Sequence, residues 1–555
     1  MSHPINRRSF LGKSAAVALG AVAASNAGGL LSACGSSGAP GGGVGGNGIS
    51  SARPKRGGTL TFGVDAEEQG FDPTQARFDE VGVMYARTVF DPLTIVTANG
   101  GWAPYLAESV TPNPEYSSWT VTLRPNLMFH DGTPCDGAAL TTNFEAHLHS
   151  LLTGPVLQPV VESIVQTGPL SVQVNMKQVF VPFPLYLAGG IGGQIAYPVA
   201  PSMLAAKNGT DHPVGTGPFV FKDWVPYSHF TATANRNYWR PGYPYLDTIT
   251  YKPILDSTAR SEALQTGSID MMVTDTPQTI VLYRGNHEWS YIDDSGPVVG
   301  EPDMNFLMLN VSKPPFNDPN VRLAVAHAIN PDQYSKVIDI GVDSPSTGLF
   351  VPGTPYYSKT NMPVPSPSLA REMISQVEQR TGKPVSFTLM TPTGPANLRS
   401  ATYIQQNLEA VGCRVSMSVM EQAQLINNAL DGTYQMTQWR QFSAVDPDLN
   451  YIFWSTTTVN DNGLSINMAR NSDPLIEAAL QEGRTNIDPS VRARAYQSVN
   501  ERLALDLPYL WTDRAVWAIV ADPSVENFNN PLTPTGQRAY GMIGGSIWPT
   551  QIWRS

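Results

Sequence analysis

The chain has 555 residues, with 46 acidic and 35 basic side chains and a formal net charge of −11. This negative balance excludes a protein that binds nucleic acid through a basic face. The length predicts two or three domains or one large interleaved body, and a hydrophobic content of 41% supplies enough apolar material for a core. The 48 glycines and 47 prolines predict many loops and turns. After the N-terminal leader no apolar run approaches about 18 residues, so we expect no membrane span there.

Residues 1–33 have the features of an export signal. A positively charged start with Arg7 and Arg8 precedes a weakly apolar stretch over residues 15–24, and the sequence Leu-Ser-Ala then leads to Cys34. This pattern resembles a twin-arginine signal that ends in a lipobox, in which the thiol of Cys34 takes a diacylglyceryl group. The alternative is an uncleaved N-terminal anchor with an incidental cysteine.

Residues 34–56 are predicted to form a tether. Eight glycines and no aromatic residue fall within residues 35–51, so this tract cannot bury enough surface to order itself. A folded body on a tether beside a lipidated cysteine indicates an extracytoplasmic protein anchored to the bacterial membrane. It would lie in a periplasmic space or on the outer face of the cell membrane.

Strands and helices are predicted along the whole remaining chain. Alternating apolar residues indicate strands over residues 58–64, around Val121, around Val174, and from Cys413 to Val419. Helices are predicted after four positions suited to the N-cap: Asp136, Asp256 or Ser257, Asp318 and Asp488. A further helix is predicted over residues 398–411. This mixture predicts an α/β fold with more than one sheet.

Cys135 and Cys413 are the cysteines that follow Cys34. Cys413 leads an alternating strand, and Cys135 lies in a loop before a helix. We predict two buried thiols, and a disulfide between them is the alternative in an oxidising compartment.

Catalytic motifs are missing from the sequence. It contains no G-x-S-x-G, H-E-x-x-H, G-x-x-x-x-G-K-[ST] or S-x-x-K pattern. The glycine-rich residues 189–193 read as a flexible turn rather than a phosphate loop. A helix would point His147 and His149 to different faces, which disfavours a metal site. We therefore expect no enzymatic activity, no metal and no cofactor.

Several blocks of sequence resemble family 5 of the extracellular solute-binding proteins, which serve ABC importers for peptides and nickel. The blocks follow the family's order from about residue 57 to the C-terminus. They are Gly57-Gly58-Thr59-Leu60, Phe71-Asp72-Pro73, Leu123-Arg124-Pro125, Phe129-His130-Asp131-Gly132-Thr133-Pro134, Gly215-Thr216-Gly217-Pro218-Phe219, Asn235-Arg236-Asn237-Tyr238-Trp239, Tyr245-Leu246-Asp247, the stretch from Ala259 to Asp270, and Pro315-Phe316-Asn317-Asp318 with the helix after it.

The resemblance implies an α/β fold of two lobes, the periplasmic-binding-protein type II clamp, with an inserted subdomain. Lobe I would combine residues 57–93, 214–303 and 513–555. The inserted subdomain would span residues 94–213, and lobe II would span residues 304–512. The chain would cross between the lobes more than once, which restricts motion to hinge closure.

The implied function is that of a monomeric substrate-binding lipoprotein of an ABC importer. It would capture a peptide-like or other small polar solute between the lobes and deliver it to the permease and its ATPase. Two alternatives stay open: an envelope or regulatory lipoprotein without a transport role, and a metal-chelate binder on the same scaffold.

The ligand-binding residues are predicted partly from the resemblance. In peptide-binding relatives a strand of the second lobe carries a Trp and, three residues later, an Asp that pairs with the peptide's amino group. Trp439 begins the corresponding stretch here, but Phe442 or Ser443 stands where the Asp is expected. Trp439 and Arg440 are candidates to bind an anionic or aromatic group. Asp446, in the next turn, is a second candidate partner for an amine.

Two further segments are candidates to line the cleft. The loop after Asp72-Pro73 reads Arg77-Phe78-Asp79, and aromatic and ionic side chains in a loop suit recognition. Trp511 lies near the return of the chain to the first lobe. The alternatives are a surface loop for residues 77–79, and a core tryptophan with a solvated arginine at Trp439 and Arg440.

Overall fold

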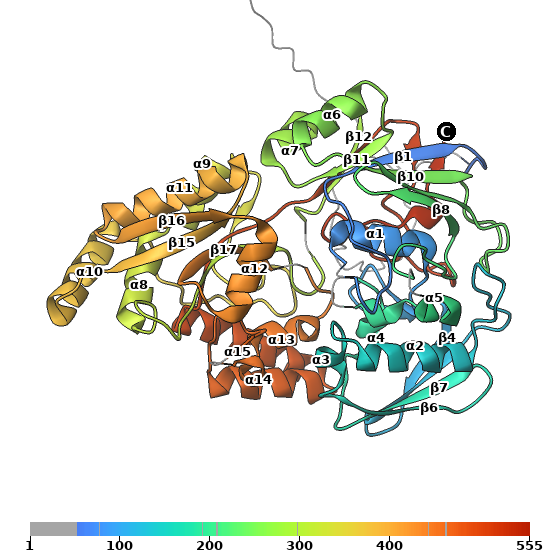
Figure 1. Cartoon of the computed structure of the whole chain (residues 1–555), viewed down its shortest axis with the longest axis horizontal. Helices are drawn as coiled ribbons and strands as arrows, with labels where there is room; N and C mark the ends of the chain where they lie inside the picture. The colour runs from blue at the N-terminus through green and yellow to red at the C-terminus, as the bar shows by residue number, and fades with distance from the viewer. Residues whose placement is uncertain are drawn as a thin grey trace, which may run out of the picture. The chain divides into compact units, whose positions relative to one another are not determined.

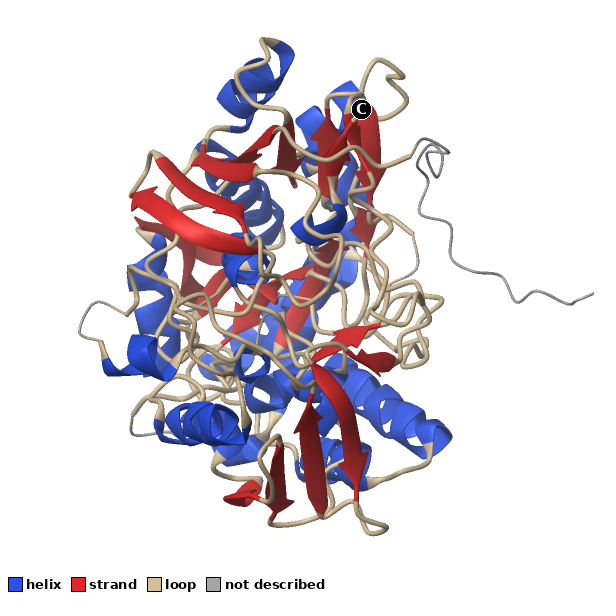
Figure 2. Cartoon of the chain, turned by 90° about the vertical axis from the view of Figure 1, so that its right-hand side faces the viewer, coloured by secondary structure: helices blue, strands red, loops and turns tan. Residues whose placement is uncertain are grey.

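The strands are gathered in separate sheets against which the helices pack (Figures 1 and 2). The computed structural model describes residues 53–76, 78–190, 193–206, 209–296, 298–441, 443–460 and 463–555. All of them belong to one unit, Gly42–Ser555. Within this part of the chain no helix is long and apolar enough to span a membrane.

The first sheet joins the start of the described chain to its C-terminal part. It has seven strands in the order β12-β19-β11-β1-β10-β9-β8. Their bounds are β1 (Thr59–Val64), β8 (Phe219–Val225), β9 (His229–Ala234), β10 (Thr248–Pro253), β11 (Met271–Thr274), β12 (Ser290–Asp293) and β19 (Ala518–Ala521). β1 pairs in parallel with β10 and β11, whereas β19 is antiparallel to β11 and β12.

The second sheet has six strands in the order β14-β18-β13-β17-β15-β16. Their bounds are β13 (Met304–Leu309), β14 (Ser344–Pro345), β15 (Ser386–Pro392), β16 (Arg414–Met420), β17 (Met436–Gln441) and β18 (Tyr509–Arg514). The central strand β13 is antiparallel to both β17 and β18. The chain therefore leaves the seven-stranded sheet after β12, builds the six-stranded sheet, and returns through β18 into β19.

A four-stranded antiparallel sheet is formed by the chain between β1 and β8, in the order β4-β5-β7-β6. Its strands are β4 (Ala107–Pro112), β5 (Ser118–Leu123), β6 (Val161–Gln166) and β7 (Ser171–Met176). Two short ladders join β2 (Thr94–Val96) to β3 (Trp102–Pro104) and β20 (Val525–Glu526) to β21 (Trp553–Arg554).

Many helices begin at an aspartate whose carboxylate accepts hydrogen bonds from the first-turn N–H groups. Asp79, Asp136, Asp256, Asp318, Asp473 and Asp488 take this place. The helices are α1 (Glu80–Val89), α2 (Gly137–His149), α3 (Gly154–Leu157), α4 (Phe183–Tyr186), α5 (Pro201–Ala205), α6 (Ser257–Gln265), α7 (Pro277–Tyr283), α8 (Pro319–Ala328), α9 (Pro331–Ile338), α10 (Pro367–Thr381), α11 (Pro395–Ala410), α12 (Gln422–Asp431), α13 (Tyr451–Trp454), α14 (Pro474–Thr485) and α15 (Pro489–Asp506). α14 and α15 lie side by side (Figure 1).

The predicted elements are confirmed, with small shifts at their ends. The strand expected over residues 58–64 is β1, and the helix expected over residues 398–411 is α11, which begins three residues earlier at Pro395. Both described cysteines, Cys135 and Cys413, are buried free thiols. Burial raises the pKa of the Cys413 thiol to about 12.

Two glycines of the family-like blocks allow close backbone approach. A Cβ at Gly215 would lie 2.2 Å from the Val89 carbonyl oxygen, and one at Gly217 would lie 2.5 Å from the Val89 carbonyl carbon. The segment before β8 therefore packs directly on the end of α1, which a larger side chain would prevent.

The four-stranded sheet shares a hydrophobic cluster with residues far along the chain. Ala444, Val445 and Leu449 are buried in the same cluster as Val121 and Leu140. The segment after β17 therefore packs on the region between β1 and β8. The predicted domain boundaries, including residues 94–213 and 304–512, stay a prediction.

A buried ion pair fixes this segment. Arg484 donates from Nε and Nη2 to the two carboxylate oxygens of Asp448, each at 3.0 Å, and the side chains are 5% and 0% exposed. The guanidinium also stacks 3.6 Å from the ring centroid of Tyr451. The hydroxyl of Tyr186 in α4 donates to the carboxylate of Asp448 at 3.0 Å, which joins α4 to α14 through one carboxylate.

We predict that Arg484→Ala lowers the free energy of unfolding by about 3–5 kcal/mol, because it leaves the Asp448 charge buried without its partner. Urea denaturation measures the loss. The matched control is Arg380→Ala, which breaks the exposed pair between Arg380 and Asp318 and should cost at most about 1 kcal/mol. Equal losses in the two variants would contradict the structural role of the buried pair.

Candidate functional site

A cavity of about 450 Å³ lies where elements of the seven-stranded and six-stranded sheets meet. One wall is the segment from Asp275 to Gln278, which follows β11 and includes the first residues of α7. The other walls come from β13, β17 and β18 and from the helices α9, α11 and α12. Both the volume and the position suit a small-molecule site, since such sites measure roughly 300–1,000 Å³ and favour boundaries between structural units.

Trp439 and Arg440 both line this cavity from β17. The antiparallel register places Trp439 opposite Phe306 and Arg440 opposite Asn305. The Trp439 ring is partly buried against a hydrophobic cluster that includes Phe306 and Met390. The strand therefore contributes both an anchored aromatic ring and a cation to the lining of the cavity.

Arg440 connects the two sheets. Its Nη1 donates to the Asp275 carboxylate at 2.8 Å, and its Nε donates to the side-chain oxygen of Asn305 at 3.0 Å. Burial lowers the pKa of the guanidinium, but the carboxylates of Asp275 and Asp303 raise it by more, so the pKa lies above its ordinary value. Arg440 is therefore a permanent cation that already has a carboxylate partner from the opposite sheet.

A second part of the cavity favours negative charge. The first turns of α11 and α12 line it, through Asn397 and Gln422 among others, and neither helix has a side-chain cap at its N-terminus. Their free N–H groups carry partial positive charge. Arg399 also lines the cavity, is exposed, and forms no ion pair with any described residue.

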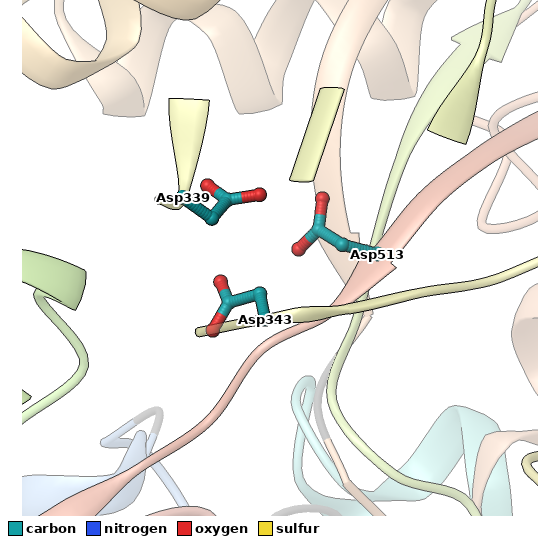
Figure 3. Close-up of side chains that lie close together, drawn as sticks. All are labelled: Asp339, Asp343 and Asp513. Carbon is teal, nitrogen blue, oxygen red and sulfur yellow. The ribbon is translucent and has the colours of Figure 1, made fainter. Parts of the chain in front are cut away.

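Three aspartates gather at another part of the wall. Asp339 follows α9, Asp343 precedes β14, and Asp513 lies in β18; one carboxylate oxygen of each lies within 4.8 Å of the others. Figure 3 shows the three carboxyl groups turned toward a common space. Asp339 and Asp343 line the cavity itself.

The mutual approach of these carboxyl groups changes their protonation. Burial and the nearby Asp513 raise the pKa of Asp339 to about 8. Burial, with Asp513 and Asp339, raises the pKa of Asp343 to about 9. Burial also raises the pKa of Asp513. The group therefore resists carrying three negative charges at neutral pH.

Asp446 has a partner away from the cavity. The side chain is 1% exposed, and both of its carboxylate oxygens accept from Nη2 of Arg492, at 2.9 and 2.8 Å. It also accepts from the backbone N–H of Asp448 at 2.9 Å, which begins the short helix Pro447–Asn450. These contacts are structural, and its predicted role as an amine partner stays untested.

The remaining candidates do not line the cavity among the described residues. Phe78 is buried in the core of the seven-stranded sheet, and the Asp79 carboxylate accepts from Val81 and Gly82 as the N-cap of α1. Trp511 is 1% exposed and packs against Phe306. The other predicted positions lie outside the described residues: Arg7, Arg8, Cys34, Arg77 and Phe442.

Several residues around the cavity were missed by sequence reasoning. Asp275 follows a strand and precedes the Thr-Pro start of α7, a placement that many structural residues share. The spacing of Asp339 and Asp343 is visible in the sequence, but Asp513 lies far beyond both. No local pattern joins these three, so the structure was needed to bring them together.

Comparisons with known proteins agree with this architecture. The family described as "Bacterial extracellular solute-binding proteins, family 5 Middle" matches residues 101–463. A glutathione-binding protein GsiB of Pectobacterium atrosepticum is 27% identical over 434 residues, which cover 74% of this chain and 80% of that protein. A nickel-binding periplasmic protein of Escherichia coli is 26% identical over 476 residues, covering 81% and 88%.

Solved structures share the fold. DppA of Helicobacter pylori in complex with the peptide STSA superposes with a TM-score of 0.77 at 22% identity, covering 90% of this chain and 98% of that one. NikA of Brucella suis in complex with Fe(III)-EDTA gives a TM-score of 0.75 at 23% identity, covering 90% and 100%. The predicted α/β fold of the two-lobed, type II periplasmic-binding-protein class is thereby confirmed. Because the family model matches residues 101–463, the chain belongs to family 5 of the bacterial extracellular solute-binding proteins.

Proposed function

We propose that this protein captures a small polar solute in the cavity between its two large sheets and delivers it, as a monomer, to an ABC permease and its ATPase. The observation that carries this proposal is the cavity of about 450 Å³ that Arg440 and Asp275 bridge from opposite sheets. A solute that contacts both walls stabilises the arrangement in which they are close, which is how ligand binding favours closure. The absence of catalytic motifs supports a binding role without catalysis.

The charges of the cavity favour a solute with an anionic group. Arg399 and the uncapped first turns of α11 and α12 attract negative charge, while Trp439 offers a flat apolar surface. Asp339 and Asp343 place carboxyl groups elsewhere in the same wall, which a cationic group of the solute would hold in the ionised form. A peptide-like solute or another polar molecule that carries charges of both signs fits this distribution.

A metal chelate is the second candidate. Similar proteins include a nickel-binding protein and a NikA structure with Fe(III)-EDTA, and an anionic chelate would suit the part of the cavity near Arg399. Other similar proteins are named for glutathione or were solved with a peptide, so the relatives do not choose between these solutes. No observation favours a regulatory lipoprotein without transport.

We further propose that the protein is a lipoprotein exported by the twin-arginine route. Residues 1–33 would be the signal, Cys34 the lipidated residue and residues 34–56 the tether. The described body would then comprise lobe I (57–93, 214–303 and 513–555), the inserted subdomain (94–213) and lobe II (304–512). The support for the anchor is the sequence of the leader, which precedes the described residues.

The binding function is tested with the natively purified full chain. We expect denaturation to release a bound solute, which mass spectrometry identifies. Trp439→Ala should weaken the binding of that solute by about 2–4 kcal/mol in calorimetric titration, because it removes a half-buried aromatic contact. The control is Trp289→Ala. Trp289 packs on Tyr283, away from the cavity, and its loss should leave the affinity within about 0.5 kcal/mol.

Equal losses in the two tryptophan variants would indicate a general effect on the fold and would remove Trp439 from the site. If no solute is released and none of a mixed panel of peptides, anionic solutes and metal chelates binds, the proposed function is wrong.

We predict that Cys34→Ala abolishes lipidation, since the thiol is the group that receives the diacylglyceryl chain. The protein should then be uncleaved or appear in soluble fractions, as measured by fractionation and intact-mass analysis. Cys135→Ala, which alters a buried thiol of the folded body, should leave lipidation unchanged. A mature, lipidated Cys34→Ala protein would refute the lipobox.

We also predict that replacing both leader arginines, Arg7→Lys with Arg8→Lys, leaves unprocessed precursor inside the cell. The double variant keeps the positive charge and removes the arginine pair. Lys13→Arg, which keeps the charge and leaves the pair intact, should be exported normally; fractionation with immunoblotting compares the three proteins. Normal export of the double variant would assign the protein to the general secretory route.

A further inference from the structure

The three aspartates come from two stretches of the chain, and Asp339 and Asp343 line the cavity. Asp339 ends α9, Asp343 lies four residues further on in the loop before β14, and Asp513 lies in β18, which pairs with β14. All three side chains are buried, with residue exposures of 7%, 6% and 0%. One carboxylate oxygen of each aspartate lies within 4.8 Å of the other two. Figure 3 draws the three side chains close together.

Only some of the carboxylate oxygens of these three aspartates accept hydrogen bonds. Asp343 Oδ1 accepts from the backbone N–H of Val516 at 3.0 Å, and Asp513 Oδ2 accepts from the side chain of Asn305 at 2.6 Å. Asp339 Oδ2 and Asp513 Oδ1 are buried and have no hydrogen-bond partner within the described chain. A buried carboxylate oxygen without a partner is costly, so these two atoms are open to a positively charged ligand.

No basic side chain of the described residues lies within ion-pair distance of these carboxyl groups. Arg440 is near enough to act on their charges, but its Nη1 is bonded to Asp275 and its Nε to Asn305. The hydroxyl of Tyr334, which also faces the cavity, is hydrogen-bonded to Ser400 Oγ at 2.6 Å.

We propose that Asp339, Asp343 and Asp513 bind a hard divalent cation, with Ca²⁺ as the best fit, in the wall of the cavity. The donors are carboxylate oxygens alone, with no imidazole or thiolate, which favours Ca²⁺, Mg²⁺ or Mn²⁺ over Ni²⁺, Cu²⁺ or Zn²⁺. Ca²⁺ tolerates the irregular geometry that a loop and two element ends provide. Because Asp339 and Asp343 face the cavity, water or a solute oxygen can complete the coordination.

The cation would join three parts of the molecule. Asp343 also holds the backbone of Val516, and Asp513 is followed directly by the segment that returns the chain to β19. The bound ion would therefore tie α9 and the loop before β14 to this crossing segment, and it would add positive charge to the cavity wall. This site goes beyond the proposed function and does not depend on which solute binds.

Calorimetric titration of the chelator-treated full chain with CaCl₂, in the absence of any solute, tests the proposal. We expect saturable binding of one ion per chain, and Asp513→Asn and Asp339→Asn should each weaken it at least about tenfold. Each variant keeps the shape of the side chain and removes one ionisable group from the crowded set, so the fold should be retained; circular dichroism checks this. If one variant fails to fold, the other decides.

The matched control is Glu68→Gln. Glu68 is another buried acid with an unpartnered oxygen, 5% exposed, but it does not belong to the three-aspartate group. The substitution Glu68→Gln should leave the affinity for Ca²⁺ unchanged. Parallel titrations with MgCl₂ and MnCl₂ rank the hard cations.

Three results would overturn the proposal. One is that the wild type binds none of Ca²⁺, Mg²⁺ and Mn²⁺ at about 10 mM, a concentration above the dissociation constants of even the weakest extracellular calcium modules. Another is unchanged binding in both folded aspartate variants. The last is that the wild type binds methylammonium but no divalent cation, and that the aspartate variants lose this binding. That result would assign the three aspartates to an organic ammonium group. Because no solute is present, these outcomes are separate from any failure of solute capture.

Discussion

Trp517 holds together the two segments that carry the chain between its large sheets. Its backbone N–H donates to Asp294 at 2.8 Å, and its indole N–H donates to Asp303 at 2.6 Å. Asp294 and Asp303 belong to the outgoing segment between β12 and β13, and Trp517 belongs to the returning segment between β18 and β19. Because the two crossings are tied side by side, a relative motion of the sheets would have to bend both of them at this place.

The cavity depends on the same junction. The guanidinium of Arg440 lies 5.7 Å from the ring centroid of Trp517, and the carboxylate of Asp275 reaches it from the opposite sheet. Asp343 accepts from Val516, one residue before Trp517. The crossings and the charged side chains of the cavity wall are therefore in direct contact, so a solute bound there would lie against the same segments. This connection suits a protein that must report its bound state to a permease.

The charged side chains described above divide into those with an ion-pair partner and those without one. Asp446 and Asp448 each pair with an arginine in the interior, where they fix the segment after β17 against α14 and α15. Arg399 and the group of Asp339, Asp343 and Asp513 form no ion pairs within the described residues and face or adjoin the cavity. A carboxylate in a turn looks the same in a sequence in both cases, which explains why Asp446 was a candidate and Asp343 was not.

The sequence by itself determined the local features and the family. Helix starts such as Asp136 and Asp488 were predictable because a cap acts on N–H groups two or three residues away, and strands such as β1 were predictable because alternation reports the buried face. The ordered blocks around residues 129–134 and 215–219 pointed to the correct family, and Trp439 and Arg440 to two residues that line the cavity. Only the tertiary structure decided which charges remain unpaired. The pairing of Asp446 with Arg492 joins residues 46 positions apart, and the bridge from Arg440 to Asp275 joins residues 165 positions apart. Asp513 approaches Asp339 and Asp343 from 174 and 170 positions away. Electrostatic interactions depend on distance and burial in space, and neither quantity can be read from the order of residues along the chain.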